Sequence, residues 1–260
     1  MTGAGRAQGG TECAALRRAL GELDAWLDAD AGRGPRRWHR CDPLVEQLRT
    51  PAAAFLRPEL ERRLARYVEA DDSFARDEIA HVLAGACGPD ALPALLRAMV
   101  SDRNEDGDTL QSDVAELFLE WPGTALALTL EHVASDDPGT RRVGLWGLCS
   151  VDDFGREHLG LVADAASDPD PGVRAHVMRT LGTLFGLGDP SRAQAILITG
   201  TFDAAPEVRR EAVGALHAWM LSRSAAPEAR AALERLTADE DADVRDAARE
   251  GLAPPVARWP

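Results

Sequence analysis

One short pattern returns along the chain and constrains its fold more than any other feature. In its clearest form, residues 168–181, an Asp-Pro-Asp-Pro-Gly turn leads into Val173, Val177 and Leu181. Proline and glycine end the preceding helix, Asp170 can cap the next one, and the four-residue spacing places the apolar residues on one helical stripe. A short helix with one narrow stripe cannot bury that stripe alone, so it needs a copy of itself alongside.

The copies are present upstream and downstream, and they recur every 30 to 36 residues. The other stripes are Ala75, Ile79, Leu83; Leu110, Val114, Phe118; Thr140, Gly144, Leu148; Val208, Ala212, Leu216; and Val244, Ala248, Leu252. The residue after the first stripe position is usually arginine: Arg76, Arg141, Arg174, Arg209 and Arg245, with Gln111 once. A period in this range with two helices per unit predicts an all-α fold, an α-α superhelix or α-solenoid.

The Asp-Pro or Asp-Ala turn, the Val-Arg pair and the Ala or Val and Leu that follow resemble the HEAT-repeat family. The resemblance covers residues 73–252 and implies about six helical hairpins. Residues 13–70 are then expected to form a divergent N-terminal helical cap, with a disordered tail at 1–12 and a second tail at 253–260. The resemblance also implies that the arginines form a structural ladder, in which each reaches an acidic or carbonyl group in a neighbouring repeat. The partners in this sequence are Asp136, Asp168, Asp203 and Asp239.

The charge balance favours some partners over others. The formal net charge is −14, which disfavours nucleic acid and favours attraction to a protein with a basic surface. All 29 basic residues are arginine, which we interpret as the coding bias of a GC-rich bacterial genome. The four cysteines are far apart, the N-terminus lacks the apolar core of a signal peptide, and no apolar run approaches a membrane span. We therefore expect a cytoplasmic protein without a membrane partner; the oligomeric state is left open.

The loop 102–113 matches the EF-hand pattern at positions 1, 3, 5 and 6. The residues that would supply oxygen ligands in this pattern are Asp102, Asn104, Asp106, Asp108 and Asp113. Asp113 stands where glutamate is usual and is one methylene short for easy bidentate contact, Thr109 replaces an apolar residue, and no second hand is present. We therefore prefer an inter-repeat loop rich in turn formers, and Ca²⁺ binding is kept as an alternative.

The face of each stripe helix that points away from the stripe is the candidate partner-binding surface, because the second helices of a solenoid usually line its concave side. Trp146 is either an anchor for a partner or packs under a neighbouring repeat. The candidate residues are Asp77, Glu78, His81, Asp113, Glu116, Arg142, Trp146, His176 and Arg179.

Catalytic motifs are absent from the sequence. The histidines show no HExxH spacing, and the chain has no P-loop, GxGxxG or GxSxG motif. Metal-dependent hydroxylases with HEAT-like folds carry His-Glu pairs, whereas Glu131-His132 and Glu157-His158 have the reverse order. HEAT-like alkylpurine glycosylases need a basic cleft, which the charge disfavours. We expect no catalytic residue and no cofactor.

Three functional hypotheses follow. The first is a non-enzymatic scaffold that binds a basic partner protein, for example an acidic adaptor or an immunity-type inhibitor of a basic toxin. The second is a bilin-lyase-like enzyme acting on a tethered small group, for which no residue identifies a site. The third is a calcium-responsive adaptor that uses the loop 102–113.

Overall fold

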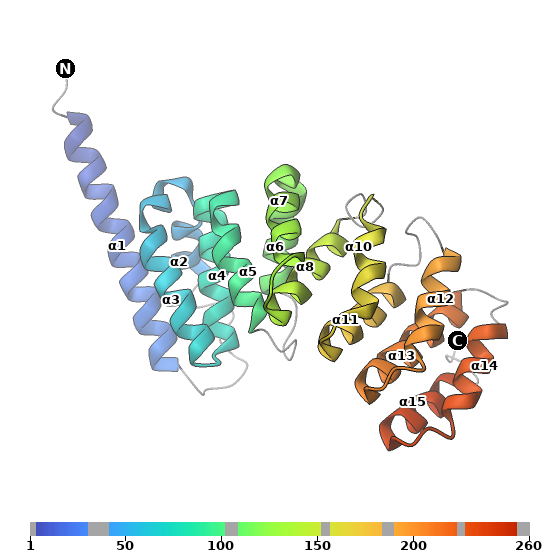
Figure 1. Cartoon of the computed structure of the whole chain (residues 1–260). Coiled ribbons are helices and arrows are strands. Elements are labelled where there is room, and N and C mark those ends of the chain that lie inside the picture. The colour runs from blue at the N-terminus through green and yellow to red at the C-terminus, as the bar shows by residue number, and fades with distance from the viewer. Residues whose placement is uncertain are drawn as a thin grey trace, which may run out of the picture. The chain divides into compact units, whose positions relative to one another are not determined.

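The computed structural model describes residues 4–30, 42–101, 109–151, 157–183, 190–222 and 227–253 (Figure 1). Within these ranges the regular structure is helical, with no strand, so the predicted all-α helical-repeat fold is confirmed. Contacts divide the chain into two units, unit 1 at Met1–Leu128 and unit 2 at Thr129–Pro260. The division into a cap at 13–70 and repeats at 73–252 stays a prediction.

Unit 1 is built around one stripe helix, α4, which packs against α2, α3, η1, η2 and α6. Its stripe residues Ala75, Ile79 and Leu83 are at most 1% exposed. In chain order the elements are α1 (Ala4–Asp30), α2 (Asp42–Leu48), η1 (Pro51–Leu56), α3 (Arg57–Glu69), α4 (Ser73–Cys87), η2 (Gly88–Ala91), α5 (Leu92–Val100) and α6 (Thr109–Glu120).

Local sequence sets where the helices of unit 1 begin and end. The Asp72 carboxylate accepts the Ala75 amide at 3.0 Å and caps α4, and Gly88 ends that helix at a φ of +54° that glycine adopts without strain. Pro58 lies in the first turn of α3, where proline is tolerated because that amide has no partner within the helix.

The N-terminal segment differs from the prediction. Helix α1 begins at Ala4, so the expectation of a disordered tail at 1–12 is wrong for residues 4–12. Further along α1, Trp26 packs against Phe74 of α4 with ring centroids 5.9 Å apart, and Asp24 accepts a 2.6 Å bond from Arg66 of α3. Helix α1 is therefore joined to the α3–α4 pair.

The segment Ser73–Val100 is apolar enough, by length and composition, to pass as a membrane span, with a mean hydropathy of 1.4 in its best window. In the structure the segment is α4, η2 and α5, and 61% of that window is buried inside the protein. Its apolar character is explained by its position in the core of unit 1.

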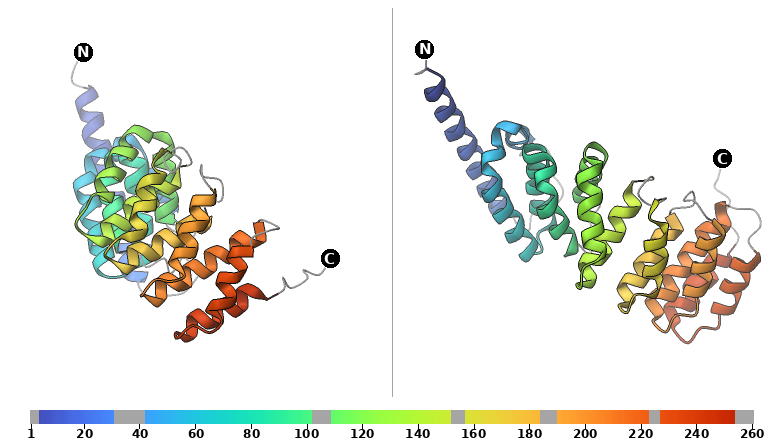
Figure 2. Two further views of the ribbon diagram at one scale, coloured as in Figure 1. Left: turned by 45° about the vertical axis from the view of Figure 1, so that its right-hand side comes forward. Right: turned by 45° about the horizontal axis from the view of Figure 1, so that its top comes forward.

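Unit 2 repeats the stripe helix in a layer, with α11 packed between α8 and α13, and α13 packed against α15. Helices α12 and α14 contact α13 and each other, so they form a second layer (Figure 2). In chain order the elements are α7 (Pro122–Val133), which crosses the boundary between the units, α8 (Pro138–Ser150), α10 (Leu159–Asp164), η3 (Ala165–Ser167), α11 (Pro171–Thr183), α12 (Pro190–Gly200), α13 (Pro206–Ser222), α14 (Pro227–Leu236) and α15 (Ala242–Leu252).

The stripe Thr140, Gly144 and Leu148 contains a glycine because two helices approach each other closely at that position. A Cβ atom added at Gly144 would lie 2.5 Å from the backbone nitrogen of Val133 and 2.9 Å from the carbonyl carbon of His132. The end of α7 approaches α8 so closely that only glycine fits, whereas Leu148 on the same stripe is fully buried.

Candidate functional site

The arginine column in unit 2 forms a repeated ladder. Arg141, Arg174 and Arg209 each donate two hydrogen bonds, from Nε and Nη2, to the two carboxylate oxygens of one aspartate in the next repeat. These distances are 2.7–2.9 Å. Their aspartate partners are Asp168, Asp203 and Asp239. The Nη1 atom of each arginine donates to two carbonyls in the turn before its own helix at 2.8–3.2 Å.

The aspartates of the ladder are held ionised. The bonds from Arg174 are the main reason that the pKa of Asp203 lies below its ordinary value of 3.8. For Asp168 and Asp239, burial pushes the pKa up, but the bonds from arginine and backbone outweigh it, so both pKa values are also lowered. The pair Arg209–Asp239 is the most buried, with side chains 7% and 8% exposed.

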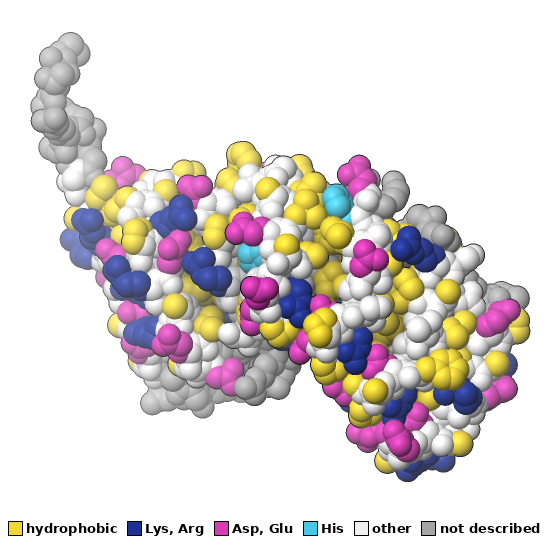
Figure 3. Space-filling view, in the orientation of Figure 1, with side chains coloured by type: hydrophobic (Ala, Val, Ile, Leu, Met, Phe, Trp, Pro, Cys, Tyr) yellow, Lys and Arg dark blue, Asp and Glu magenta, His cyan; other side chains and the backbone are white. Residues whose placement is uncertain are grey.

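The ladder therefore ties repeats together, which confirms the predicted structural role for three of the five arginines. Asp136 takes part through its backbone carbonyl, which accepts a bond from Arg141 at 2.8 Å. Arg245 repeats only the carbonyl contacts, to Asp239 and Glu240, and Arg76 bonds its sequence neighbour Asp77 at 2.8 Å. On the drawn face of unit 2, acidic and basic side chains are interspersed (Figure 3).

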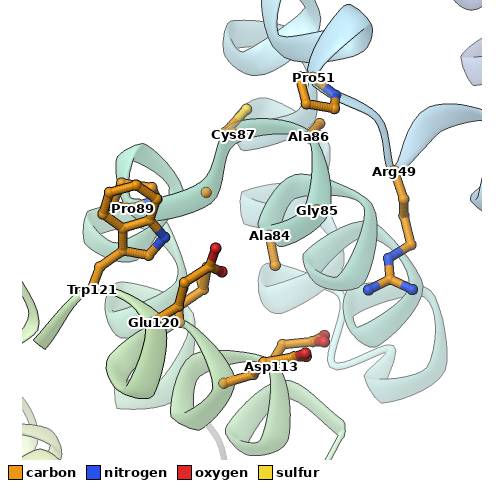
Figure 4. Close-up of a pocket in the computed structure, with 13 residues that line it drawn as sticks. Arg49, Pro51, Ala84, Gly85, Ala86, Cys87, Pro89, Asp113, Glu120 and Trp121 are labelled. Atoms are coloured by element: carbon orange, nitrogen blue, oxygen red, sulfur yellow. The ribbon is translucent and has the colours of Figure 1, made fainter.

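Unit 1 instead contains a cavity of about 390 Å³ between the end of α2, the start of η1, α4, η2 and α6 (Figure 4). Asp113, Glu116 and Glu120 line it from successive turns of α6, and Arg49 lines it from the opposite side. The remaining lining is mostly apolar: Pro51, Ala84, Gly85, Ala86, Cys87, Gly88, Pro89, Leu117 and Trp121.

Two buried polar atoms at this cavity lack a partner among the described residues. Asp113 is 5% exposed; the Nδ1–H of His81 donates to its Oδ1 at 2.6 Å, but its Oδ2 has no hydrogen bond. The Nε of Arg49 also has none, and the nearest carboxylate to its Nη1 is Glu46 at 3.9 Å. Burial of a carboxylate oxygen without a donor is costly, so a donor supplied from outside would stabilise this wall of the cavity.

Gly85 sets the position of Arg49. A Cβ atom at this glycine would lie 3.0 Å from the Cβ of Arg49 and 3.1 Å from its Nε. The missing side chain lets the arginine lie directly against α4, with its Nε buried there.

The predicted acidic surface of unit 1 is only partly available for binding. Asp77 is paired with Arg76, Glu78 is half-buried, and His81 and Asp113 bond each other across α4 and α6. Glu116 is exposed and lines the cavity. Whether these residues bind a partner stays a prediction.

The predicted residues of unit 2 lie on α8 and α11. Arg142 is exposed, Trp146 is half-buried, and Arg179 forms a bidentate pair with Glu211 of α13 at 3.1 Å. Burial, with the nearby charges of Arg179 and Arg142, lowers the pKa of His176 to about 4. The imidazole is therefore neutral at pH 7, and its Nε2 is buried without a partner among the described residues.

The sequence interpretation missed three residues of the cavity. Glu120 lies ten residues after Leu110, the first residue of its stripe, and Gly85 lies ten residues after Ala75 on α4. Extending the stripe analysis to the ends of both helices would have identified Glu120. Trp121 directly follows α6 and is 43% exposed. Arg49 comes from a segment outside the repeats, and no repeat pattern points to it.

The residues that the structure describes bear on two kinds of chemistry, metal binding and attack by the Cys87 thiol. No group of three His, Cys, Asp or Glu side chains there could hold a metal ion. Asp102, Asn104, Asp106 and Asp108 lie outside the described residues, and Asp113 is bonded to His81. Burial raises the pKa of the Cys87 thiol at the cavity, so this thiol is protonated at neutral pH.

Comparison with known proteins supports the repeat architecture. A model of HEAT repeats matches residues 126–217, and no curated protein matches the chain. The complex of CpcE and CpcF of phycocyanin lyase from Nostoc sp. PCC7120 is similar at 20% identity and a TM-score of 0.49, over 63% of this chain and 98% of that chain.

Human deoxyhypusine hydroxylase, in complex with glycerol, is similar at 20% identity and a TM-score of 0.39, over 91% of this chain and 96% of the hydroxylase. A designed armadillo repeat protein in complex with the peptide (KR)4 has 13% identity and a TM-score of 0.37, over 89% of this chain and 98% of the designed protein. These scores are too low to carry an inference about function. The chain is thus a helical-repeat protein, and its residues 126–217 match the model of HEAT repeats.

Proposed function

We propose that this chain is a non-enzymatic scaffold that binds a partner protein with a basic surface on the α4–α6 face of unit 1. The observation that carries the proposal is the cavity on that face, where three carboxylates and one guanidinium surround a space bordered by the exposed Trp121. An acidic recess with an aromatic rim is the composition expected of an anchor point for a basic protein.

Unit 1 is favoured over unit 2 as the partner-binding surface because more of the charged side chains of unit 2 are already paired within the protein. In unit 2 three arginines and three aspartates bond each other in the ladder, and Arg179 and Glu211 also pair with each other. Glu116 and Glu120 of unit 1 are exposed at the cavity. The net charge of −14 adds long-range attraction for a basic partner.

One concrete form of this function is an acidic adaptor or an immunity-type inhibitor that covers the basic surface of a toxin. The bilin-lyase-like and calcium-responsive alternatives are favoured by no contact among the described residues.

The test begins with identification of a partner. The full chain is immobilised, proteins retained from its source cells are identified by mass spectrometry, and the best candidate is purified for calorimetry. The double charge reversal Glu116→Lys and Glu120→Lys is expected to weaken binding about tenfold or more.

The matched control is Glu228→Lys with Glu250→Lys, which reverses two exposed charges in unit 2 and should leave the affinity within about twofold. Purified partners that are acidic, or that bind both double variants equally, would contradict the proposal. Asp77 and Asp113 are unsuitable for charge reversal because each bonds another side chain inside unit 1, so a lysine there would disturb the packing.

A further inference from the structure

We infer that the cavity of unit 1 is a subsite for one lysine side chain of the partner, with the ammonium group among Asp113, Glu116 and Glu120. This inference rests on the proposed protein-binding function. Asp113 is 95% buried, lines the cavity and has an oxygen without a hydrogen bond among the described residues. A buried carboxylate with an unused acceptor favours a cationic donor over a neutral one.

The walls of the cavity suit a long side chain with a charged end. Its volume of about 390 Å³ lies at the small end of the range for ligand pockets, which starts near ~300 Å³. Ala84, Ala86 and Leu117 supply apolar surface for the four methylenes of lysine. The indole of Trp121, on the opposite side from Arg49 in Figure 4, is placed to cover the alkyl chain or the ammonium group.

The arrangement of acceptors favours ammonium over guanidinium. A guanidinium binds best to both oxygens of one carboxylate, as the arginines of the ladder do in unit 2. At Asp113 one oxygen is already bonded to His81, so this bidentate geometry is closed. An ammonium group has three donors that rotate freely, so it can bond the single unused oxygen of Asp113 and direct its other donors elsewhere.

Arg49 completes the subsite and limits what enters it. Its single positive charge, next to Glu46 at 3.9 Å, is outnumbered by the three carboxylates at the cavity.

The test uses the full chain labelled with ¹⁵N, and blocked amino acids as probes. Nα-acetyl-lysine N-methylamide is titrated while the indole N–H signal of Trp121 is followed, after assignment with Trp121→Phe. The arginine and norleucine counterparts follow. We expect a saturable shift with lysine, at least about threefold weaker binding of the arginine probe, and no saturable shift with norleucine, which has the same chain without the charge.

Asp113→Asn keeps the size of the side chain and its acceptor for His81, and it should weaken binding of the lysine probe about tenfold. Glu120→Gln, at an exposed position, provides a second variant if the first does not fold, and about threefold weaker binding is expected. Glu250→Gln in unit 2 is the control and should change nothing.

Equal shifts with the norleucine probe, tighter binding of the arginine probe, or undiminished lysine binding in the variant that folds would overturn the inference. The proposed function is tested separately. If the purified partner still loses affinity for the Glu116 and Glu120 double reversal while the lysine probe does not bind, the scaffold function stands and the lysine subsite is rejected.

Discussion

Units 1 and 2 contain the same stripe helix but join neighbouring copies by different polar contacts. In unit 2, each of Arg141, Arg174 and Arg209 binds an aspartate of the next repeat. In unit 1 the equivalent positions are Arg76, bonded to its neighbour Asp77, and Gln111. Helices α4 and α6 are instead bridged by His81 and Asp113.

In unit 2 the recurring charges bond neighbouring repeats to each other, whereas unit 1 keeps a charged oxygen without a partner among the described residues. In the ladder of unit 2 both aspartate oxygens are bonded, with a backbone amide adding a further bond at 2.9 Å. In unit 1 the equivalent bridge leaves the Oδ2 of Asp113 without a partner among the described residues, next to a cavity. We therefore expect substitutions in the ladder of unit 2 to change stability, and substitutions at the cavity of unit 1 to change partner binding.

The largest expected effect comes from breaking the most buried rung of the ladder. Arg209→Ala leaves Asp239 buried without its cation, and loss of one partner of a buried pair costs about 3–5 kcal/mol. Urea denaturation measures the loss, and hydrogen exchange locates it in unit 2. Arg210→Ala, which removes the adjacent, half-exposed arginine, should cost no more than ~1 kcal/mol. Equal losses in the two variants would show that the ladder is not what stabilises unit 2.

Acid is expected to have the next largest effect, because it acts on several groups of unit 2 at once. The pKa of His176 is lowered from 6.5 to about 4, so its contribution to stability is present above pH 6.5 and is lost as the pH falls toward 4. The lowered pKa values of Asp168, Asp203 and Asp239 give stability that is lost further down, below the ordinary value of 3.8.

Thermal unfolding followed by circular dichroism at stepped pH tests this order. The melting temperature of unit 2 should fall between pH 6.5 and 4, and His176→Gln should flatten that part of the profile. A profile that falls equally in the variant would show that His176 does not contribute.

The smallest of the three effects concerns a glycine. Gly144→Ala places a Cβ atom 2.5 Å from the nitrogen of Val133 and is expected to cost about 1–3 kcal/mol by overpacking α8 against α7. Gly214→Ala on α13 has no atom within 4 Å of the new Cβ and should stabilise that helix by up to ~1 kcal/mol. Chemical denaturation of both variants checks the signs, and a neutral Gly144→Ala would mean that the two helices can separate without cost.

Much of the fold was predictable because stripe and period are local properties of the sequence. Val173, Val177 and Leu181 are at most 2% exposed, as the four-residue spacing predicted, and the partners of three arginines were foreseen from the turn aspartates. The start of α1 was missed because a glycine-rich segment suggests a tail, whereas it continues a helix that contacts α3.

The sequence by itself determined the helices, their buried stripes and the ladder, because each depends on residues that recur at a fixed spacing. Only the tertiary structure decided which charges remain available. Arg49, Asp113 and Glu120 meet because a segment outside the repeats packs against Gly85, and no periodicity records that contact. Side chains from distant parts of the chain are brought together by packing, and packing also decides whether a carboxylate is paired, exposed or buried with an unused oxygen.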